Sequence, residues 1–337
     1  MEILIGLLII AAGSFGQSSS YVPIRKVREW SWESFWLVQG IFAWIIFPLA
    51  GALAAVPEGH TLADVLGIDP KAALSAAGYG VLWGVGGLTF GLSMRYLGVS
   101  MGQSISLGTC AAFGTLFPAI MAGTDLFHGD GLILLAGVCI TLAGISVIGY
   151  AGSLRSKGLP EEERKAAIVD YSLTKGLAVA LLAGVMSACF ALGLDAGKPL
   201  QTEGMKPLVK TLPATFMVTC GGFLTNIVYC LFQNFRNRTF SDYTRWNVWP
   251  GNLFFCALAG LLWYSQFFGL GAGVSFFEPG SALTAFAWCI LMSLNVVFSN
   301  VWGLILKEWK GVSGKTVSVL IAGIAILIFS LVFPSIV

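Results

Sequence analysis

The sequence predicts an all-α membrane protein in which ten helices cross the bilayer. Its 19 Lys and Arg residues and 17 Asp and Glu residues are confined to a few clusters along the chain. Ten charge-free stretches separate these clusters, and a helix needs roughly 20 apolar residues to span the hydrocarbon layer. A soluble chain of 337 residues would scatter its charges over its surface, so a multi-pass membrane protein is the economical interpretation. The stretches are 3–24, 34–57, 72–94, 96–124, 131–154, 176–194, 211–235, 246–277, 279–306 and 316–337.

The composition agrees with this fold class and excludes several others. Hydrophobic residues make up 56% of the chain and charged residues 11%, whereas about 25% charged residues is usual in soluble domains. Long runs of consecutive apolar residues favour helices over the alternating strands of a membrane barrel. The net charge of +2 is too small to indicate nucleic-acid binding. The seven cysteines lie in apolar stretches without metal-ligand spacing, so we expect no disulfide framework, metal or other cofactor.

The sequence within and beside each of the first five stretches supports a helix there. The stretch 3–24 has only Glu2 before it and lacks the positive flank of a signal peptide, so we expect a retained helix. The stretch 34–57 begins after a basic segment and is apolar at consecutive positions. The third helix carries two pairs of glycines spaced by four, Gly80 with Gly84 and Gly87 with Gly91, a spacing that allows close helix packing. The fourth and fifth helices are divided by a short acidic loop.

A hydrophilic connection precedes the second set of five helices. It contains a charged run at 161–165 and lies near the midpoint of the chain. The ninth helix has Pro279 at its expected start, where proline suits the first helical turn. We therefore divide the chain into a first five-helix repeat at 1–153, a cytoplasmic linker at 154–175 and a second five-helix repeat at 176–337.

Positive charge is distributed unevenly between the two sides of the predicted membrane. Only four of the 19 Lys and Arg residues, namely Lys71, Lys198, Lys206 and Lys210, fall in the even-numbered connections between helices. The positive-inside rule then places the odd-numbered connections in the cytoplasm. With ten helices, both termini are predicted to lie on the periplasmic side of a bacterial inner membrane.

A weak internal repeat points to a class of function. Five helices per repeat is an odd number, so the second repeat must cross the membrane in the opposite sense to the first. Inverted repeats are typical of secondary transporters, which bind their substrate near the middle of the bilayer. The matching strings, in the same order in both halves, are 12–13 with 183–184, 81–83 with 261–263, and 136–138 with 322–324.

Several local strings are more specific, because they combine Trp, Pro and charged residues. They are YVPIRKVREWSWE at 21–33, MRYLGVSMG at 94–102, KGL at 175–177, AGKP at 196–199, LWYSQFF at 262–268 and LKEW at 306–309. Together they resemble the family of bacterial L-rhamnose–proton symporters along the whole chain. The resemblance implies the ten-helix fold of the drug/metabolite transporter superfamily and the import of a sugar, L-rhamnose being favoured, by proton symport.

A sugar carries hydroxyls around a ring with apolar faces, so its site needs hydrogen-bonding side chains and an aromatic wall. Polar groups inside membrane helices are costly unless they are paired or face a wet cavity. Each candidate also has a structural alternative, such as an interfacial position for Trp and Tyr or a bond from Ser to its own helix. The substrate-binding candidates are Gln17, Ser18, Gln39, Trp83, Gln103, Ser104, Asn226, Trp263, Tyr264, Gln266, Trp288 and Asn295, with Gln17, Gln103 and Gln266 ranked first.

Proton coupling requires a titratable group near the substrate. Glu278 is the only charged residue between Arg245 and Lys307, and a carboxylate at the bilayer centre costs roughly 2.5–3.5 kcal/mol. Its alternative role is to cap the ninth helix, since an acid is favoured at the positive end of a helix. Asp195 is the second candidate, with an ion pair to Lys198 as the alternative.

Three functions other than proton-coupled sugar import are alternatives. Within the transporter class, the alternative is a superfamily carrier of another sugar or small metabolite without proton coupling. From a different class, an intramembrane enzyme would need a catalytic or metal constellation at span depth, which the sequence lacks. A membrane sensor would need a soluble segment to relay its signal. We therefore expect a transporter, not an enzyme, whose partners are a sugar, the proton and the lipid bilayer.

Overall fold

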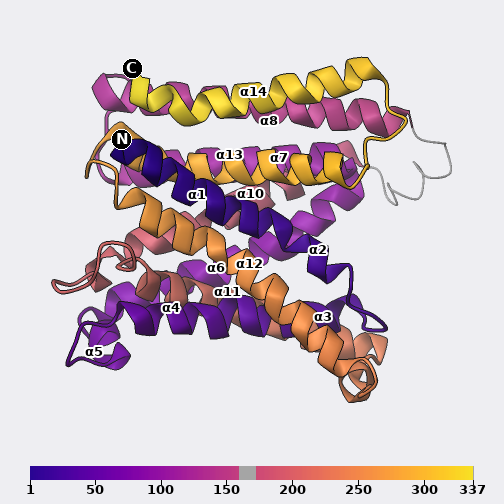
Figure 1. Ribbon diagram of the computed structural model, residues 1–337, viewed down its shortest axis with the longest axis horizontal. Helices are drawn as coiled ribbons and strands as arrows, with labels where there is room; N and C mark the ends of the chain where they lie inside the picture. Colours follow the sequence, from indigo (N-terminus) through magenta and orange to yellow (C-terminus); the bar gives the residue numbers. More distant parts are fainter. Residues whose placement is uncertain (159–171, 337) are drawn as a thin grey trace. The chain divides into compact units, whose positions relative to one another are not determined.

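Ten long helices make up the framework of the protein. The structure is a computed structural model that describes residues 1–158 and 172–336. Within these residues, ten helices are long and apolar enough to cross a membrane, and each coincides with one of the predicted stretches. The prediction of an all-α membrane protein with ten transmembrane helices is therefore confirmed for the described part of the chain (Figure 1).

The elements follow the chain in a simple order, and short helices cap or connect the long ones. They are α1 (Glu2–Ser19), α2 (Tyr21–Ile24), α3 (Trp32–Gly40), η1 (Ile41–Ile46), α4 (Phe47–Ala55), α5 (Leu62–Gly67), α6 (Pro70–Leu97), α7 (Val99–Met121), α8 (Gly129–Lys157), α10 (Leu173–Ala196), η2 (Lys198–Leu200), α11 (Leu212–Asn237), η3 (Phe240–Thr244), α12 (Trp249–Val274), α13 (Ala282–Ile305) and α14 (Gly314–Ile336).

Several helices run past the charges that were used to delimit them. Arg95 lies inside α6, and Arg155 and Lys157 lie inside α8. Long basic side chains allow this, because their apolar stems follow the helix while the charged head reaches water. The ends of the predicted linker at 154–175 therefore belong to α8 and α10, and its middle part, 159–171, lies outside the described residues.

The second membrane-spanning helix is a single rod made of α3, η1 and α4, and its middle is a π-helix. Pro48 has no backbone N–H, so the carbonyl of Trp44 loses its usual partner four residues ahead. Next to this gap, the backbone N–H of Phe47 bonds to the carbonyl of Phe42, five residues earlier, rather than to the carbonyl four residues earlier. Short π segments inside α-helices occur often at functional sites. This one contains Trp44.

The chain forms two compact units, and each combines segments from both halves of the sequence. Unit 1 consists of Met1–Gly84 and Leu192–Phe276, and unit 2 consists of Val85–Ala191 and Phe277–Val337. Helices α6 and α10 each contribute residues to both units. The inverted five-helix repeats at 1–153 and 176–337 describe the sequence rather than these units, and they stay a prediction.

In unit 1, α1 and α12 pack closely in antiparallel directions. A Cβ atom on Gly13 would lie 2.6 Å from the carbonyl oxygen of Ser265 and 3.1 Å from the Cα atom of Gly269. The Ser265 hydroxyl donates a hydrogen bond to the Gly13 carbonyl, at 3.0 Å. Small residues thus allow the two backbones to approach, as is common between membrane helices.

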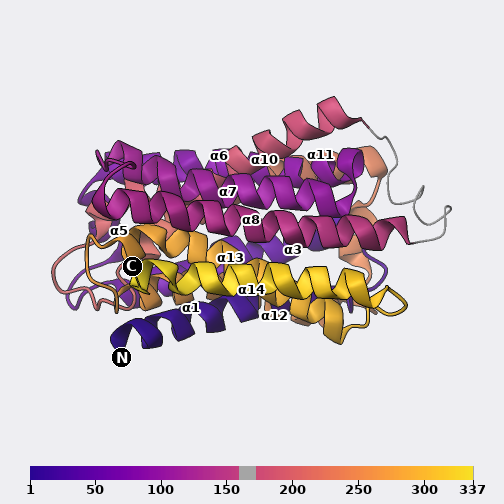
Figure 2. The same cartoon turned by 90° about the horizontal axis from the view of Figure 1, so that it is seen from above.

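In unit 2, α8 and α14 lie side by side and antiparallel along their length (Figures 1 and 2). Gly144 on α8 leaves room for Leu327, and Gly323 on α14 leaves room for Ile148. The Thr141 hydroxyl donates to the Ser330 hydroxyl of the facing helix, at 3.1 Å. This buried hydrogen bond satisfies two polar groups that lipid would leave unpaired.

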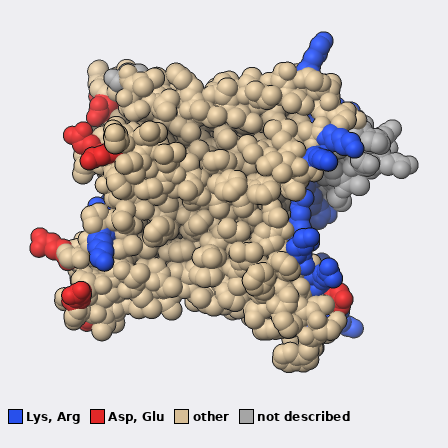
Figure 3. Space-filling view, in the orientation of Figure 1, with Lys and Arg blue, Asp and Glu red and all other residues tan. Residues whose placement is uncertain are grey.

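Lys and Arg side chains are concentrated at one end of the helices, and the opposite end carries most of the Asp and Glu side chains of the described residues together with some lysines (Figure 3). In unit 2, Arg155 closes α8 and Lys315 opens α14, whereas Asp130 lies at the start of α8. In unit 1, Arg236 lies in the last turn of α11, whereas Asp69 directly precedes α6. Each unit therefore has an end rich in Lys and Arg and an opposite end with more acidic residues.

Candidate functional site

Unit 1 contains an aromatic cluster to which four membrane-spanning helices contribute. Trp44 of η1 is at its centre, with its ring centroid 6.0 Å from that of Trp83 on α6 and 6.0 Å from that of Trp263 on α12. The rings of Trp83 and Trp263 are 5.8 Å apart and tilted by 33°. Phe223 of α11 completes the cluster, 6.5 Å from Trp44. Trp83 and Trp263 are only half-buried.

Two glycines make room for these rings. The ring of Trp83 lies against Gly222 of α11 so closely that any Cβ there would overlap it. The ring of Trp44 folds back over Gly40 of its own rod, where a Cβ would lie 2.5 Å from it. These close contacts restrict the positions that the two indoles can adopt.

Asn226 joins this cluster to a further tryptophan. Its amide oxygen accepts a hydrogen bond from the indole N–H of Trp36, at 3.0 Å, and its amide nitrogen donates to the carbonyl of Gly222, at 2.8 Å. The ring of Trp36 lies 5.6 Å from that of Trp44. Asn226 therefore has a structural role in holding the aromatic cluster, and it stays a candidate for substrate binding.

Seven buried side-chain polar atoms in unit 1 have no hydrogen-bond partner among the described residues, and three of these belong to Trp44 or to the sequence neighbours of Gly40 and Trp263. These three atoms are the amide oxygen of Gln39, the indole nitrogen of Trp44 and the hydroxyl of Tyr264. Leaving such an atom unpaired costs about 1–3 kcal/mol. A hydroxylated ligand or water supplies partners of the kind these atoms lack, as expected of a sugar site. The Tyr264 hydroxyl lies against Gly51 of α4.

The remaining unit 1 candidates lie on the packed pair α1 and α12. The Ser18 hydroxyl is buried and bonds to the amide oxygen of Gln17, at 3.2 Å. Gln266 is buried, and its amide nitrogen donates to the carbonyl of Trp263, at 3.1 Å. This bond connects Gln266 to the backbone of Trp263, a member of the aromatic cluster.

In unit 2, Trp288 differs from the tryptophans of unit 1. It is buried, stacks on Phe190 at 6.0 Å, and its indole N–H donates to the carbonyl of Cys110, at 3.3 Å. Its ring lies against Gly114 of α7. These contacts are those of a core side chain. Gln103 of α7 and Asn295 of α13 are half-buried.

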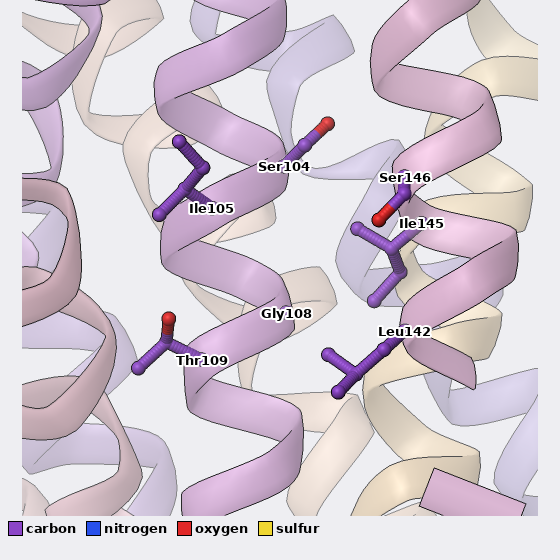
Figure 4. Close-up of a pocket in the computed structure, with 7 residues that line it drawn as sticks. All are labelled: Ser104, Ile105, Gly108, Thr109, Leu142, Ile145 and Ser146. Carbon is purple, nitrogen blue, oxygen red and sulfur yellow. The ribbon is translucent and has the colours of Figure 1, made fainter. Parts of the chain in front are cut away.

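Ser104 lines a narrow groove between α7 and α8 in unit 2 (Figure 4). Leu142, Ile145 and Ser146 point from α8 toward α7, where Gly108 lies opposite them (Figure 4). The groove has a volume of about 190 Å³, below the 300–1,000 Å³ typical of ligand sites. None of the seven residues that line it is aromatic, and it matches a sugar less well than the aromatic cluster of unit 1.

The two predicted coupling carboxylates lie near helix ends. Glu278 is exposed in the turn before α13, and its backbone carbonyl accepts hydrogen bonds from Ser281 and Thr284, both at 2.8 Å. Asp195 forms an ion pair with Lys198. The ion pair considered as the alternative role of Asp195 is therefore present, whereas coupling by either carboxylate stays a prediction.

The sequence analysis did not select Trp36, Trp44 or Glu33. Trp36 and Trp44 lie on one predicted helix, eight residues apart, and this spacing was the available signal. Glu33 was assigned to a charged connection, whereas the structure places it in the first turn of α3, buried.

Comparisons with known proteins identify the family. The family model described as "L-rhamnose-proton symport protein (RhaT)" matches residues 1–335. The chain belongs to the L-rhamnose–proton symporter family. An L-rhamnose-proton symporter of Mannheimia succiniciproducens is 32% identical over 342 residues, which cover 98% of this chain and 96% of the relative. One of Yersinia pestis (strain Pestoides F) is 32% identical over 341 residues, 97% of this chain and 96% of the relative.

Family membership confirms the resemblance that the local strings indicated. The symporter family consists of transporters rather than enzymes, and the ten apolar helices make this member a multi-pass protein of the bacterial inner membrane. The aromatic cluster of unit 1 now has a functional context, because sugars are recognised by aromatic surfaces together with a few placed polar groups.

Proposed function

We propose that this protein imports L-rhamnose together with protons across the bacterial inner membrane. The observation that carries the proposal is the family match over residues 1–335, supported by relatives named as L-rhamnose-proton symporters along nearly their whole length. A proton gradient supplies the free energy for accumulation, and the protein supplies a site that binds the sugar.

The substrate site of this proposal is the aromatic cluster of unit 1. The half-buried faces of Trp83 and Trp263 offer an apolar wall for the C–H face of the sugar ring. The unpaired polar atoms of Gln39, Trp44 and Tyr264 offer an acceptor, a donor and a hydroxyl for its hydroxyl groups. Gln17, Ser18, Asn226 and Gln266 extend the candidate set in unit 1, and Gln103, Ser104, Trp288 and Asn295 are the candidates in unit 2.

The orientation in the membrane is part of the same proposal. The Lys- and Arg-rich end of each unit is assigned to the cytoplasm by the positive-inside rule, so both termini lie in the periplasm (Figure 3). Glu278 and Asp195 remain candidates for proton coupling, and both lie toward the periplasmic end in this orientation.

The test is uptake into proteoliposomes that contain the purified protein. We expect L-rhamnose to accumulate when the outside is more acidic than the inside, and an uncoupler to abolish the accumulation. Uptake that reaches equilibrium but ignores the pH difference would support the uncoupled carrier instead. Absence of uptake for L-rhamnose and for a broad panel of sugars would refute the proposal.

A further inference from the structure

Unit 1 buries two carboxylates at its Lys- and Arg-rich end. Glu33 lies in the first turn of α3 and is 5% exposed, and Asp242 lies in η3 and is 3% exposed. They are the only charged side chains that the described part of the chain buries. Burial of a charge is expensive unless hydrogen bonds or an opposite charge compensate for it, so their partners need to be accounted for.

Glu33 ties the start of α3 to the end of α11. One of its carboxylate oxygens accepts hydrogen bonds from the amide of Asn237, at 3.0 Å, and from the hydroxyl of Thr239, at 2.8 Å. Both donors lie where α11 ends. Hydrogen bonds to a charged acceptor are stronger than those between neutral groups, so this contact favours the ionised carboxylate.

Asp242 ties η3 to the residues just before α3. Its carboxylate accepts hydrogen bonds from the backbone N–H of Ser31, at 2.8 Å, and from the Ser31 hydroxyl, at 2.7 Å. Burial acts to raise the pKa of Asp242, but the bonds from Ser31 and Ser34 and the charge of Arg245 outweigh it, so that this pKa lies below its usual value. The carboxylate is therefore ionised at neutral pH.

Asn234 connects the two carboxylate sites into one network. Its amide nitrogen donates to the hydroxyls of Ser34, at 2.9 Å, and Thr239, at 2.8 Å. Its amide oxygen accepts from the hydroxyl of Tyr243, at 3.0 Å. We call this network the acidic clamp; it comprises Ser31, Glu33, Ser34, Asn234, Asn237, Thr239, Asp242 and Tyr243.

The groups around Glu33 determine how strongly its ionised form is favoured. Burial opposes ionisation of Glu33, as does the like charge of Asp242, whereas the donors Asn237 and Thr239 favour it. Tyr243 of η3 and Cys230 of α11 also lie within electrostatic range of Glu33. Arg245 is 3.7 Å from Asp242 and compensates mainly that carboxylate.

We propose that Glu33, supported by Asp242, binds the coupled proton, and that the acidic clamp is closed when this proton has been released. The inference rests on the proposed proton symport and names its proton site. A proton from water binds a carboxylate oxygen of Glu33 and converts it to a neutral carboxylic acid, and release returns the proton to water. No other covalent bond forms or breaks.

The direction of coupling follows from linkage. The closed clamp stabilises the ionised form of Glu33, so it binds a proton less tightly than an arrangement without these donors. By reciprocity, a bound proton favours opening of the clamp, and loss of the proton favours closing. Since the clamp joins α3, α11 and η3, protonation of one side chain alters the connection between the second and seventh membrane-spanning helices.

Transport measurements test this proposal with Glu33→Gln, which mimics the protonated state. Two assays are compared in proteoliposomes: accumulation of L-rhamnose under an inward proton gradient, and exchange of internal for external L-rhamnose without a gradient. We expect Glu33→Gln to lose accumulation but retain exchange, with an exchange rate that no longer depends on pH. The matched control is Glu29→Gln, which removes an exposed carboxylate near the same Arg245 and is expected to behave as the wild type.

Accumulation by Glu33→Gln with the wild-type pH dependence would overturn the proposal. If Glu33→Gln loses both activities, Glu33→Asp decides, because it keeps an ionisable group. Accumulation by Glu33→Asp with a shifted pH profile supports the proton site. An unshifted profile, or inactivity of Glu33→Asp as well, shows that the side chain has only a structural role and overturns it.

Thermal unfolding of the purified protein tests the clamp independently of transport. A group whose pKa is lowered by folding stabilises the protein above its unfolded pKa, and this stabilisation is lost as the pH falls. For Asp242 the loss begins as the pH falls below about 4, the usual value for an aspartate. We expect the wild type and Glu29→Gln to lose thermal stability on acidification, and Asp242→Asn to lose less, because it lacks the carboxylate that must be protonated.

If the melting temperatures of the three proteins change with pH in the same way, the acidic clamp is overturned. A wild type that transports no L-rhamnose would refute the proposed function while leaving this unfolding measurement interpretable. The two failures are therefore distinguishable.

Discussion

At the scale of single residues, two buried tryptophans differ in what their indole N–H groups meet. The indole nitrogen of Trp44 has no hydrogen-bond partner among the described residues, whereas that of Trp288 donates to the carbonyl of Cys110, at 3.3 Å. An unsatisfied buried donor lowers stability, and a satisfied one contributes to it. We therefore propose that Trp44 donates to the sugar, whereas Trp288 serves the core.

This contrast gives a testable prediction. Trp44→Phe removes a donor that the free protein does not use, so we expect a loss of L-rhamnose affinity by about 2- to 10-fold, which corresponds to one hydrogen bond of about 0.5–1.5 kcal/mol. Trp288→Phe removes a used donor and should lower the melting temperature more than Trp44→Phe does. Sugar binding by titration calorimetry and thermal unfolding measure the two effects. An unchanged affinity in Trp44→Phe would remove its indole nitrogen from the site.

The sequence identified part of this cluster and missed its centre. Trp83 and Trp263 were selected as polar-tipped aromatic residues inside predicted spans, and the structure brings them together. Trp44 was not selected, because it lies in an apolar run that suits a lipid-facing helix equally well. Its position depends on the π-helix that Pro48 favours and on the space beside Gly40, which single-residue properties do not reveal.

Glu33 was missed for a different reason. The predicted membrane helices are charge-free stretches of sequence. A charged residue at the end of a helix, such as Glu33, is therefore always assigned to the neighbouring loop. Whether such a carboxylate is buried depends on donors far along the chain, here Asn237 and Thr239, and sequence spacing does not predict that contact.

At the scale of elements, glycines determine how closely α6 and α11 approach in unit 1. A Cβ on Gly80 would overlap the carbonyl oxygen of Val218, and a Cβ on Gly84 would lie 2.9 Å from the carbonyl oxygen of Gly222. The close packing expected from this pair is confirmed. Gly87 and Gly91, the second pair, have nothing within 4 Å among the described residues, so the same motif has no such contact there.

We predict opposite effects for two neighbouring glycines of α6. Gly80→Ala should destabilise the protein by about 1–3 kcal/mol, because the backbone of α11 has to move to admit the methyl group. Gly78 has nothing within 4 Å, so Gly78→Ala should be neutral or stabilise by up to about 1 kcal/mol through its higher helix propensity. Thermal unfolding of both variants in the same detergent measures the difference. Equal destabilisation would contradict the proposed contact between α6 and α11.

At the scale of the whole molecule, the number and approximate positions of the membrane-spanning helices followed from charge alone. Excluding charge from lipid is a strong constraint and acts on each segment independently, so it can be seen in a linear sequence. The two units could not be predicted in this way. Each joins helices from distant parts of the chain, such as α1 with α12, and these pairs depend on the shapes of facing surfaces, as with Gly13 and Gly269.

The orientation of the whole chain leads to a prediction that needs no substrate. The positive-inside rule places the end of α8 in the cytoplasm and the end of α14 in the periplasm. Alkaline phosphatase fused after Val337 should therefore be active and green fluorescent protein fused there should be dark, because the first folds in the periplasm and the second in the cytoplasm. Fusions after Gly158 are the matched control and should give the reverse result. Fluorescence from the C-terminal fusion would invert the orientation and, with it, would place the acidic clamp on the side from which protons enter.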